Sequence, residues 1–261
     1  MNLKISKSEL KKYHANGWVK IPNFIDKKST LKVKRLINNF IKKNIKKNNS
    51  SSRHINFVGS KNVSNLKNLN SFHQLTNSQW IKNFAIKKNL LSIIENFLGA
   101  KAKYKASELF AKPAKKGLPA PVHQDNFYWA VKNSNALTIW IALDDSNKKN
   151  GGIFYYQGSH KFGILDHVPS HAKGSSQTVK NLNFLKKFKK VYPNLKKGDA
   201  LVHHCLIVHG SNKNVSKKNR KGWTLQYKDK FSTYDLRQKK KYEKSLNLQL
   251  QQRKKDSYAR I

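Results

Sequence analysis

The stretch ALTIWIALDDSNKKNGGIFYYQG (136–158) holds two short apolar runs separated by a polar turn rich in Asp, Asn, Lys and Gly. Similar short runs recur from about residue 101 to about residue 232, bounded by Gly, Pro, Asn or Asp. Many short strands with turn signals between them predict a barrel or a sandwich. Further runs of this kind are KYKASELFAK (103–112), DALVHHCLIVHG (199–210) and GWTLQYK (222–228).

The segment before this region, about 6–99, has mainly helical patterns. In its first helix, Ser6 or Ser8 can cap the start and Gly17 can end it. The class predicted is therefore mainly β with flanking helices. The expected elements of the segment are a helix over 6–17, a strand over 18–25, a helix over 28–45 and a helix over 77–99.

The chain of 261 residues suits one large domain, and we expect it to cover residues 1–236. The polar run KKNNSSSR (46–53) is the best internal break, but it is too short to mark a domain boundary. Residues 237–261 are largely polar and basic, and we expect a tail that is partly helical.

The charge of the chain is unusual, with 54 Lys and Arg against 13 Asp and Glu, a formal net charge of +41. One interpretation is a nucleic-acid-associated binder or oxygenase. The other is a drift in composition toward lysine, which we favour because the lysines are spread along the whole chain. Proteins that recognise nucleic-acid phosphates and bases also use more Arg than the six found here. Nucleic-acid binding is then expected only through nonspecific charge.

The single cysteine, Cys205, excludes an intrachain disulfide framework and fits a reducing compartment. The first ten residues lack the apolar run of a secretory signal, and no stretch is apolar enough to span a membrane. These features predict a cytoplasmic protein. Nothing in the sequence distinguishes a monomer from a dimer.

The tripeptide His123-Gln124-Asp125 follows a short apolar run. On a strand, residues i and i+2 point to the same face, so one imidazole and one carboxylate can meet at one point. With a third ligand this becomes the two-His, one-carboxylate set that holds non-haem iron(II). Alone the tripeptide is a weak signal, and a solvated loop or a buried His–Asp hydrogen bond is the more frequent explanation.

A third ligand can come from LKKGDALVHHCLIVHGS (195–211), where three histidines compete. His203 and His209 share one face if the strand is regular, whereas His204 faces the other way. His209 lies at the strand end, where a barrel would open. His203 and His204 lie deeper, where they fit hydrogen-bonded core residues or groups that orient a ligand.

Arg220 follows His209 by eleven residues, after the polar loop SNKNVSKKN. Two strands joined by that loop can bring Arg220 beside the strand that carries His209. A guanidinium binds a carboxylate through two parallel hydrogen bonds, which a lysine cannot do. The alternative is a surface arginine in a basic loop.

Four segments, in this order along the chain, together resemble the phytanoyl-CoA dioxygenase family of iron(II)- and 2-oxoglutarate-dependent oxygenases. The resemblance covers most of the chain but not the part after about residue 232. The segments are YHANGWVKIPNFI (13–25), KPAKKGLPAPVHQDNFYW (112–129), TIWIALDDSNKKNGGIFYYQGSHKFG (138–163) and KKGDALVHHCLIVHGS (196–211) with Arg220.

The resemblance implies a double-stranded β-helix, the jelly-roll or cupin-like core, and a small-molecule substrate. It implies iron(II) held by His123, Asp125 and His209, with 2-oxoglutarate and O2 as co-substrates. It implies that Arg220 and Ser211 bind the far carboxylate of 2-oxoglutarate and that Trp140 lies near it. Because Asp125 is present, the resemblance implies hydroxylation, since related halogenases lack this carboxylate.

Three residues around the implied site bear on substrate or co-substrate. Asn126 and Tyr128 directly follow the metal motif and are candidates for the substrate entrance, although an ordinary barrel core explains the aromatic residues there equally well. Glu108 falls near a position where family members carry Gln, Asn or Met against 2-oxoglutarate. A glutamate there would repel the dianion, so Glu108 is not among the candidates.

Overall fold

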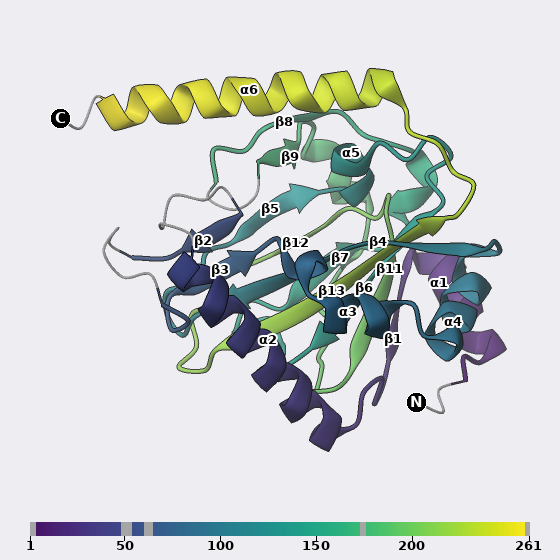
Figure 1. The fold of residues 1–261 in the computed structure, drawn as a ribbon. Helices are drawn as coiled ribbons and strands as arrows, with labels where there is room; N and C mark the ends of the chain where they lie inside the picture. The colour runs from purple at the N-terminus through teal and green to yellow at the C-terminus, as the bar shows by residue number, and fades with distance from the viewer. Residues whose placement is uncertain (1–3, 48–53, 60–64, 173–175, 259–261) are drawn as a thin grey trace.

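A computed structural model describes residues 4–47, 54–59, 65–172 and 176–258 of the chain. Two antiparallel sheets face each other and form the predicted jelly-roll core (Figure 1). The seven-stranded sheet has the order β1 (Trp18–Ile21), β11 (Ala200–His204), β6 (Ala136–Ala142), β13 (Arg220–Asp229), β4 (Ala102–Lys112), β3 (Leu69–Phe72) and β2 (Ile55–Phe57). The four-stranded sheet has the order β10 (Lys190–Val191), β7 (Ile153–Tyr156), β12 (His209–Ser211) and β5 (Ala120–His123). β8 (His167–Pro169) and β9 (Gln177–Val179) form a separate hairpin.

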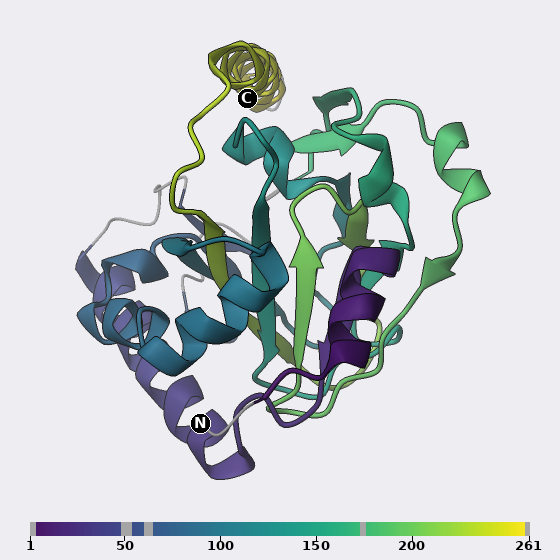
Figure 2. The same cartoon turned by 90° about the vertical axis from the view of Figure 1, so that its right-hand side faces the viewer.

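Helices cover the outer face of the large sheet (Figures 1 and 2). Every residue of β6 is buried, because this strand has the helices on one face and the small sheet on the other. Ile139 packs in the core beneath the helices, whereas Trp140 belongs to a cluster between the two sheets. The face that carries Thr138 and Trp140 is therefore the interior face. The covering helices are α1 (Lys7–Asn16), α2 (Lys27–Lys47), α3 (Gln79–Ala85) and α4 (Lys88–Leu98).

The N-terminal helix α1 has the predicted caps. The Ser6 side chain accepts a hydrogen bond from the backbone N–H of Glu9, and the Glu9 carboxylate accepts one from the backbone N–H of Ser6. Gly17 ends the helix in the left-handed conformation, with φ of 80°. β1 then begins at once, so this short segment joins a helix directly to the edge of the large sheet.

Three expectations for the first hundred residues need correction. The strand expected over 18–25 ends at Ile21. The helix expected over 77–99 is two helices, because Lys87 adopts an extended backbone, with ψ of 132°, between α3 and α4. The break lets both helices bury apolar side chains in one core. The strands β2 and β3, which the sequence analysis did not predict, extend the large sheet. Most of the expected loop 46–53 lies outside the described residues.

The strand expected over 199–209 is also wrong as a single element. β11 ends at His204 and β12 begins at His209, and the two strands lie in different sheets. A turn closed by a hydrogen bond from Ile207 N–H to the His204 carbonyl, 3.0 Å, joins them. Because this corner is buried from Cys205 to Val208, its apolar residues look like a continuous strand in the sequence.

The last helix, α6 (Leu236–Tyr258), contains the described part of the segment that we expected as a tail. It packs on α5 (Asp125–Trp129) and β8, and its inward positions are polar. Because the residues of α6 that face the core are polar, the sequence lacks the apolar periodicity of a packed helix. The sequence therefore did not predict that this helix packs on the core. Among the described residues, no helix is long and apolar enough to cross a membrane.

Candidate active site

Three side chains from separate elements converge between the two sheets: His123 at the end of β5, Asp125 at the start of α5 and His209 at the start of β12. Their ligand atoms all lie within 4.8 Å of one another. Asp125 Oδ1 lies 3.8 Å from His123 Nε2 and 3.7 Å from His209 Nε2. The two imidazoles are cross-strand partners on β5 and β12. The structure therefore brings the three predicted ligands together.

The local backbone of the His-x-Asp motif differs from the expected strand. Asp125 begins a short helix, but Gln124 before it stays extended, with φ of −117° and ψ of 132°. One extended residue is enough to send the side chains at i and i+2 to the same side. The Gln124 amide donates to the Gly163 and Leu206 carbonyls, which fixes the segment between the two ligands.

Both candidate histidine ligands are oriented by backbone carbonyls. His123 Nδ1 lies 2.8 Å from the Pro121 carbonyl, and His209 Nδ1 lies 3.0 Å from the Ile207 carbonyl. Because a carbonyl oxygen only accepts hydrogen bonds, each Nδ1 carries the proton of the neutral ring. The lone pair then lies on Nε2, the nitrogen that faces Asp125, as metal binding requires.

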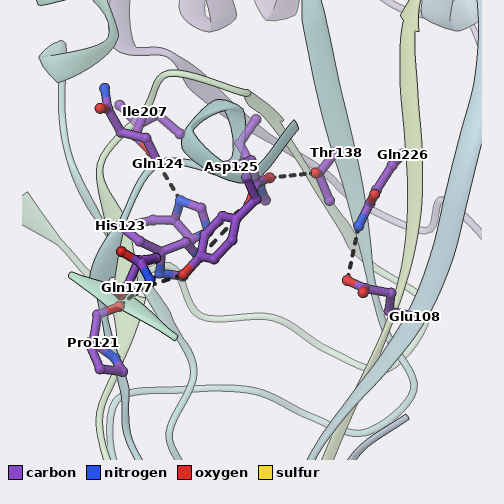
Figure 3. A network of polar contacts seen from close by, with 12 residues as sticks. Glu108, Pro121, His123, Gln124, Asp125, Thr138, Gln177, Ile207 and Gln226 are labelled. Atoms are coloured by element: carbon purple, nitrogen blue, oxygen red, sulfur yellow. Dashed lines mark hydrogen bonds and ion pairs between the residues drawn. The ribbon is translucent and has the colours of Figure 1, made fainter. Parts of the chain in front are cut away.

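The two oxygens of Asp125 have different environments. Thr138 donates a hydrogen bond of 2.7 Å to Oδ2 (Figure 3), and His203 Nε2 lies 3.3 Å from the same oxygen. His203 is itself bonded to the Tyr155 hydroxyl at 2.9 Å. Oδ1 faces His123 and His209. His203 therefore orients the carboxylate and is not part of the three-residue cluster.

Charge at the cluster also fits a metal centre. Burial lowers the pKa of His123 and of His209 to about 4, although the Asp125 carboxylate acts in the opposite direction. Burial alone would raise the pKa of Asp125, but the adjacent histidines hold it well below its usual range. At neutral pH the cluster presents two neutral imidazoles and one carboxylate, which are the forms that bind a metal cation.

Arg220, at the start of β13, is buried with 2% of its surface exposed. Its Nε and Nη2 both donate to the Gly151 carbonyl, at 3.1 and 2.5 Å, and its guanidinium lies 5.3 Å from the Trp140 ring. Burial lowers its pKa to about 9. Within the described ranges no carboxylate forms an ion pair with it, and a buried cation without a counter-ion is costly.

A second buried basic side chain, that of Lys112, lies opposite Arg220 on β4. Its amino group donates to the carbonyls of Leu118 and Asn212, the latter at 2.7 Å. Burial and the charge of Arg220 lower the pKa of Lys112 to about 6. The sequence analysis did not single out Lys112, although its place before Pro113 in the quoted segment was a usable signal. The charge of Arg220 makes this end of the core suited to an anion, and a bound anion would favour the protonated form of Lys112.

Trp140 lies against Arg220, and Ser211 is next in the chain to Asn212, which contacts Lys112. Ser211 is buried on β12, two residues after His209, and Asn212 next to it accepts the Lys112 hydrogen bond. Trp140 lies on the interior face of β6 and packs against Gly222 of β13, where a Cβ would come within 1.8 Å of the ring. Both predicted co-substrate residues thus lie near the Arg220 and Lys112 end of the core.

Glu108 also points to the interior, because it pairs across the sheet with Thr224, which in turn pairs with Trp140. Its carboxylate lies 2.8 Å from His73 Nδ1 and accepts a 3.0 Å hydrogen bond from Gln226 (Figure 3). Burial would lower the pKa of His73, but Glu108 raises it overall. The raised pKa favours the protonated imidazole, which would offset negative charge that repels an anionic ligand. Neither His73 nor Gln226 was signalled by the sequence.

The two candidates for the substrate entrance separate in the structure. Asn126 is fully buried, and its amide donates to the Val131 carbonyl and to the Ser134 hydroxyl, which indicates a structural role. Tyr128 stands edge-on to the His123 ring, with the centroids 5.6 Å apart. Its hydroxyl lies 3.5 Å from the Gln177 carbonyl (Figure 3). Only Tyr128 faces the metal cluster.

Comparison with known proteins gives consistent matches. A family model for phytanoyl-CoA dioxygenase (PhyH) matches residues 13–222. The peroxisomal phytanoyl-CoA dioxygenase of Bos taurus is 24% identical over 232 residues, 86% of this chain and 69% of that protein. A probable alpha-ketoglutarate-dependent hypophosphite dioxygenase of Stutzerimonas stutzeri is 27% identical over 54% of this chain and 50% of its own. The phytanoyl-CoA dioxygenase 1 of rice is 32% identical over 46% of this chain and 42% of its own.

Solved structures show the same fold. The non-heme alpha ketoglutarate dependent carbocyclase SnoK from nogalamycin biosynthesis superposes with a TM-score of 0.70 and 21% identity, over 88% of this chain and 87% of that one. The apoform of EctD from S. alaskensis superposes with a TM-score of 0.71 and 19% identity, over 88% of this chain and 79% of that one.

Proposed function

Since this chain belongs to the phytanoyl-CoA dioxygenase family, whose members use iron(II), 2-oxoglutarate and dioxygen, we propose that it is a hydroxylase of a small metabolite. In this reaction an unactivated C–H is hydroxylated, while 2-oxoglutarate is converted to succinate and CO2. The observation that carries the proposal is the cluster of His123, Asp125 and His209 in a core that also contains the buried Arg220.

The donor set supports iron(II) as the metal. His123, Asp125 and His209 would hold it, since two imidazole nitrogens and one carboxylate form the facial set that leaves coordination positions open. When bound, the iron would supply the oxidation chemistry. The chain itself keeps the ligands in their binding forms through Pro121, Ile207 and the bonds to Asp125 Oδ2.

The cationic end of the core supports 2-oxoglutarate as the co-substrate. Arg220 would bind the carboxylate remote from the metal, with Ser211 as a further donor and Trp140 as one wall. Among the described residues, the hydrogen bonds of Arg220 go to the Gly151 and Phe110 carbonyls, so a ligand carboxylate would provide a counter-charge.

On the substrate side we propose Tyr128, and no longer Asn126, as a residue lining the entrance. The net charge of +41 favours an anionic substrate, because the positive field raises the local concentration of anions. Asp125 occupies the position whose loss accompanies halogenation in relatives, which supports hydroxylation. We also propose a cytoplasmic location, since the lone Cys205 fits a reducing compartment.

Anaerobic addition of iron(II) and 2-oxoglutarate to the purified protein tests this function. We expect a weak visible charge-transfer band in the wild type and in His14→Ala, which changes an exposed histidine, and no band in His123→Ala. Absence of the band in folded, metal-loaded wild-type protein would contradict the proposal. A screen that compares succinate formation with and without candidate metabolites then identifies the substrate.

A further inference from the structure

The helix α6 lies across one end of the core, over α5 and the β8–β9 hairpin (Figures 1 and 2). It follows the part of the chain that matches the family model, which ends at residue 222. α5 begins with the candidate ligand Asp125. A helix outside the shared family region is thus packed on the element that carries a metal ligand.

Hydrogen bonds hold α6 in register on this end. Gln238 donates to the Phe127 carbonyl of α5 at 3.3 Å, and the Ser245 hydroxyl donates to the Gln177 side chain of β9 at 2.6 Å. The Gln249 side chain accepts from the backbone N–H groups of Ser170 and His171, at 3.1 and 3.2 Å. All three helix residues are buried.

Aromatic contacts continue from α6 to the metal cluster. The Tyr242 ring stands edge-on to Tyr128, with the centroids 5.3 Å apart, and Tyr128 stands edge-on to His123 at 5.6 Å. Tyr242 also meets Phe127 at 6.3 Å, and Phe127 stacks on His167 at 4.1 Å. Tyr242 of α6 is therefore separated from the candidate metal ligand His123 by one side chain, that of Tyr128.

The composition of the α6 face that meets the core argues against a purely stabilising role. Gln238, Tyr242, Ser245 and Gln249 follow helical spacing, so they share one face. A helix docked only for stability buries apolar residues. Here the amide nitrogens of Gln177 and Gln249 are buried without a hydrogen-bond partner among the described residues, which opposes docking. Polar contacts of this kind specify one position of the helix.

We propose that α6 is part of the active-site wall and that Tyr242 is a positioning residue that holds Tyr128 against the His123 ring. The inference rests on the proposed function, because it takes His123 as an iron ligand. In this arrangement α6 restrains residues 123–128 and closes the substrate side of the metal cluster.

A double-mutant cycle on iron(II) affinity tests the positioning role. We expect Tyr242→Ala and Tyr128→Ala each to weaken iron(II) binding about tenfold, a size typical of residues that orient metal ligands. Because both changes remove the same contact chain, the double variant should be no weaker than Tyr128→Ala alone. Tyr242→Phe keeps the ring and should bind iron(II) like the wild type. Lys244→Ala, on the exposed face of α6, is the matched control.

Hydrogen exchange of the metal-free protein gives a second readout, independent of turnover. Tyr242→Ala, and a chain ending at residue 235, should both exchange faster at the amides of residues 124–131, whereas Lys244→Ala should not. Wild-type iron(II) affinity and exchange in Tyr242→Ala, or strictly additive effects in the cycle, would overturn the inference. If folded wild-type protein binds no iron(II), the proposed function itself fails, which is a different result.

Discussion

At the scale of single residues, Arg220 shows why a chain so rich in lysine has an arginine at this position. Its planar guanidinium donates to the Gly151 carbonyl and to the Phe110 carbonyl while staying buried against Trp140. A lysine ammonium is a point donor and cannot hold both carbonyls and a ligand carboxylate in one plane. The nearby Lys112 already uses its amino group on two carbonyls.

Arg220→Lys is predicted to weaken 2-oxoglutarate binding and to leave iron(II) binding in place. Loss of one charge-assisted hydrogen bond raises the Kd for 2-oxoglutarate by roughly 10- to 100-fold. Titration of the iron(II)-loaded protein with 2-oxoglutarate measures the change. Arg35→Lys, at an exposed position of α2, should bind like the wild type. Equal affinities in all three proteins would remove Arg220 from the co-substrate site.

At the scale of elements, the alternation of three neighbouring strands builds the interior of the site. Trp140 on β6, Thr224 on β13 and Glu108 on β4 form one cross-strand row, and Thr138 and Gln226 belong to the next row on the same face. The intervening residues of these strands pack under the helices. Gly222 gives the Trp140 ring the room it needs beside β13.

Gly222→Ala is predicted to destabilise the fold and to weaken 2-oxoglutarate binding together. The new Cβ would lie 1.8 Å from Trp140 Cζ2, so the ring must move, and overpacking of this kind costs about 1–3 kcal/mol. Thermal unfolding and 2-oxoglutarate titration measure the two effects. Adding Trp140→Phe, which shortens the ring system, should restore part of the stability. A Gly222→Ala variant as stable as the wild type would contradict the packing described here.

At the scale of the whole molecule, the net charge of +41 is not explained by the active site. The buried basic residues Arg220 and Lys112 account for little of it. Many other lysines lie exposed on helices and loops along the chain. Charge of this kind attracts anions of every type through a field that salt screens. It fits the interpretation as a compositional feature of the chain.

Binding to oligonucleotides is therefore predicted to be nonspecific. At low salt the affinity should be measurable, it should fall steeply as salt rises, and a sulfated polysaccharide of equal charge should compete as well as nucleic acid. Fluorescence anisotropy with two unrelated sequences at several salt concentrations measures this. Tight binding of one sequence at physiological salt, resistant to the polysaccharide, would instead favour a function on nucleic acid.

Local sequence determined much of this protein. The Ser6 and Glu9 capping box, the end of α1 at Gly17 and the convergence of His123 and Asp125 depend on residues within a few positions of one another. These contacts form within short segments of the chain, so they depend on the local backbone and not on the packing of distant elements. Four motifs in order also predicted the family and the jelly-roll core, and both are confirmed.

Only the tertiary structure decided which distant groups meet. It shows how His209 joins the metal cluster while His203 orients Asp125, because an unpredicted turn moves the chain from one sheet to the other. It also paired Glu108 with His73 and docked α6 through polar residues. These contacts join residues far apart in the chain and carry no local apolar pattern, so they exist only once the sheets have closed.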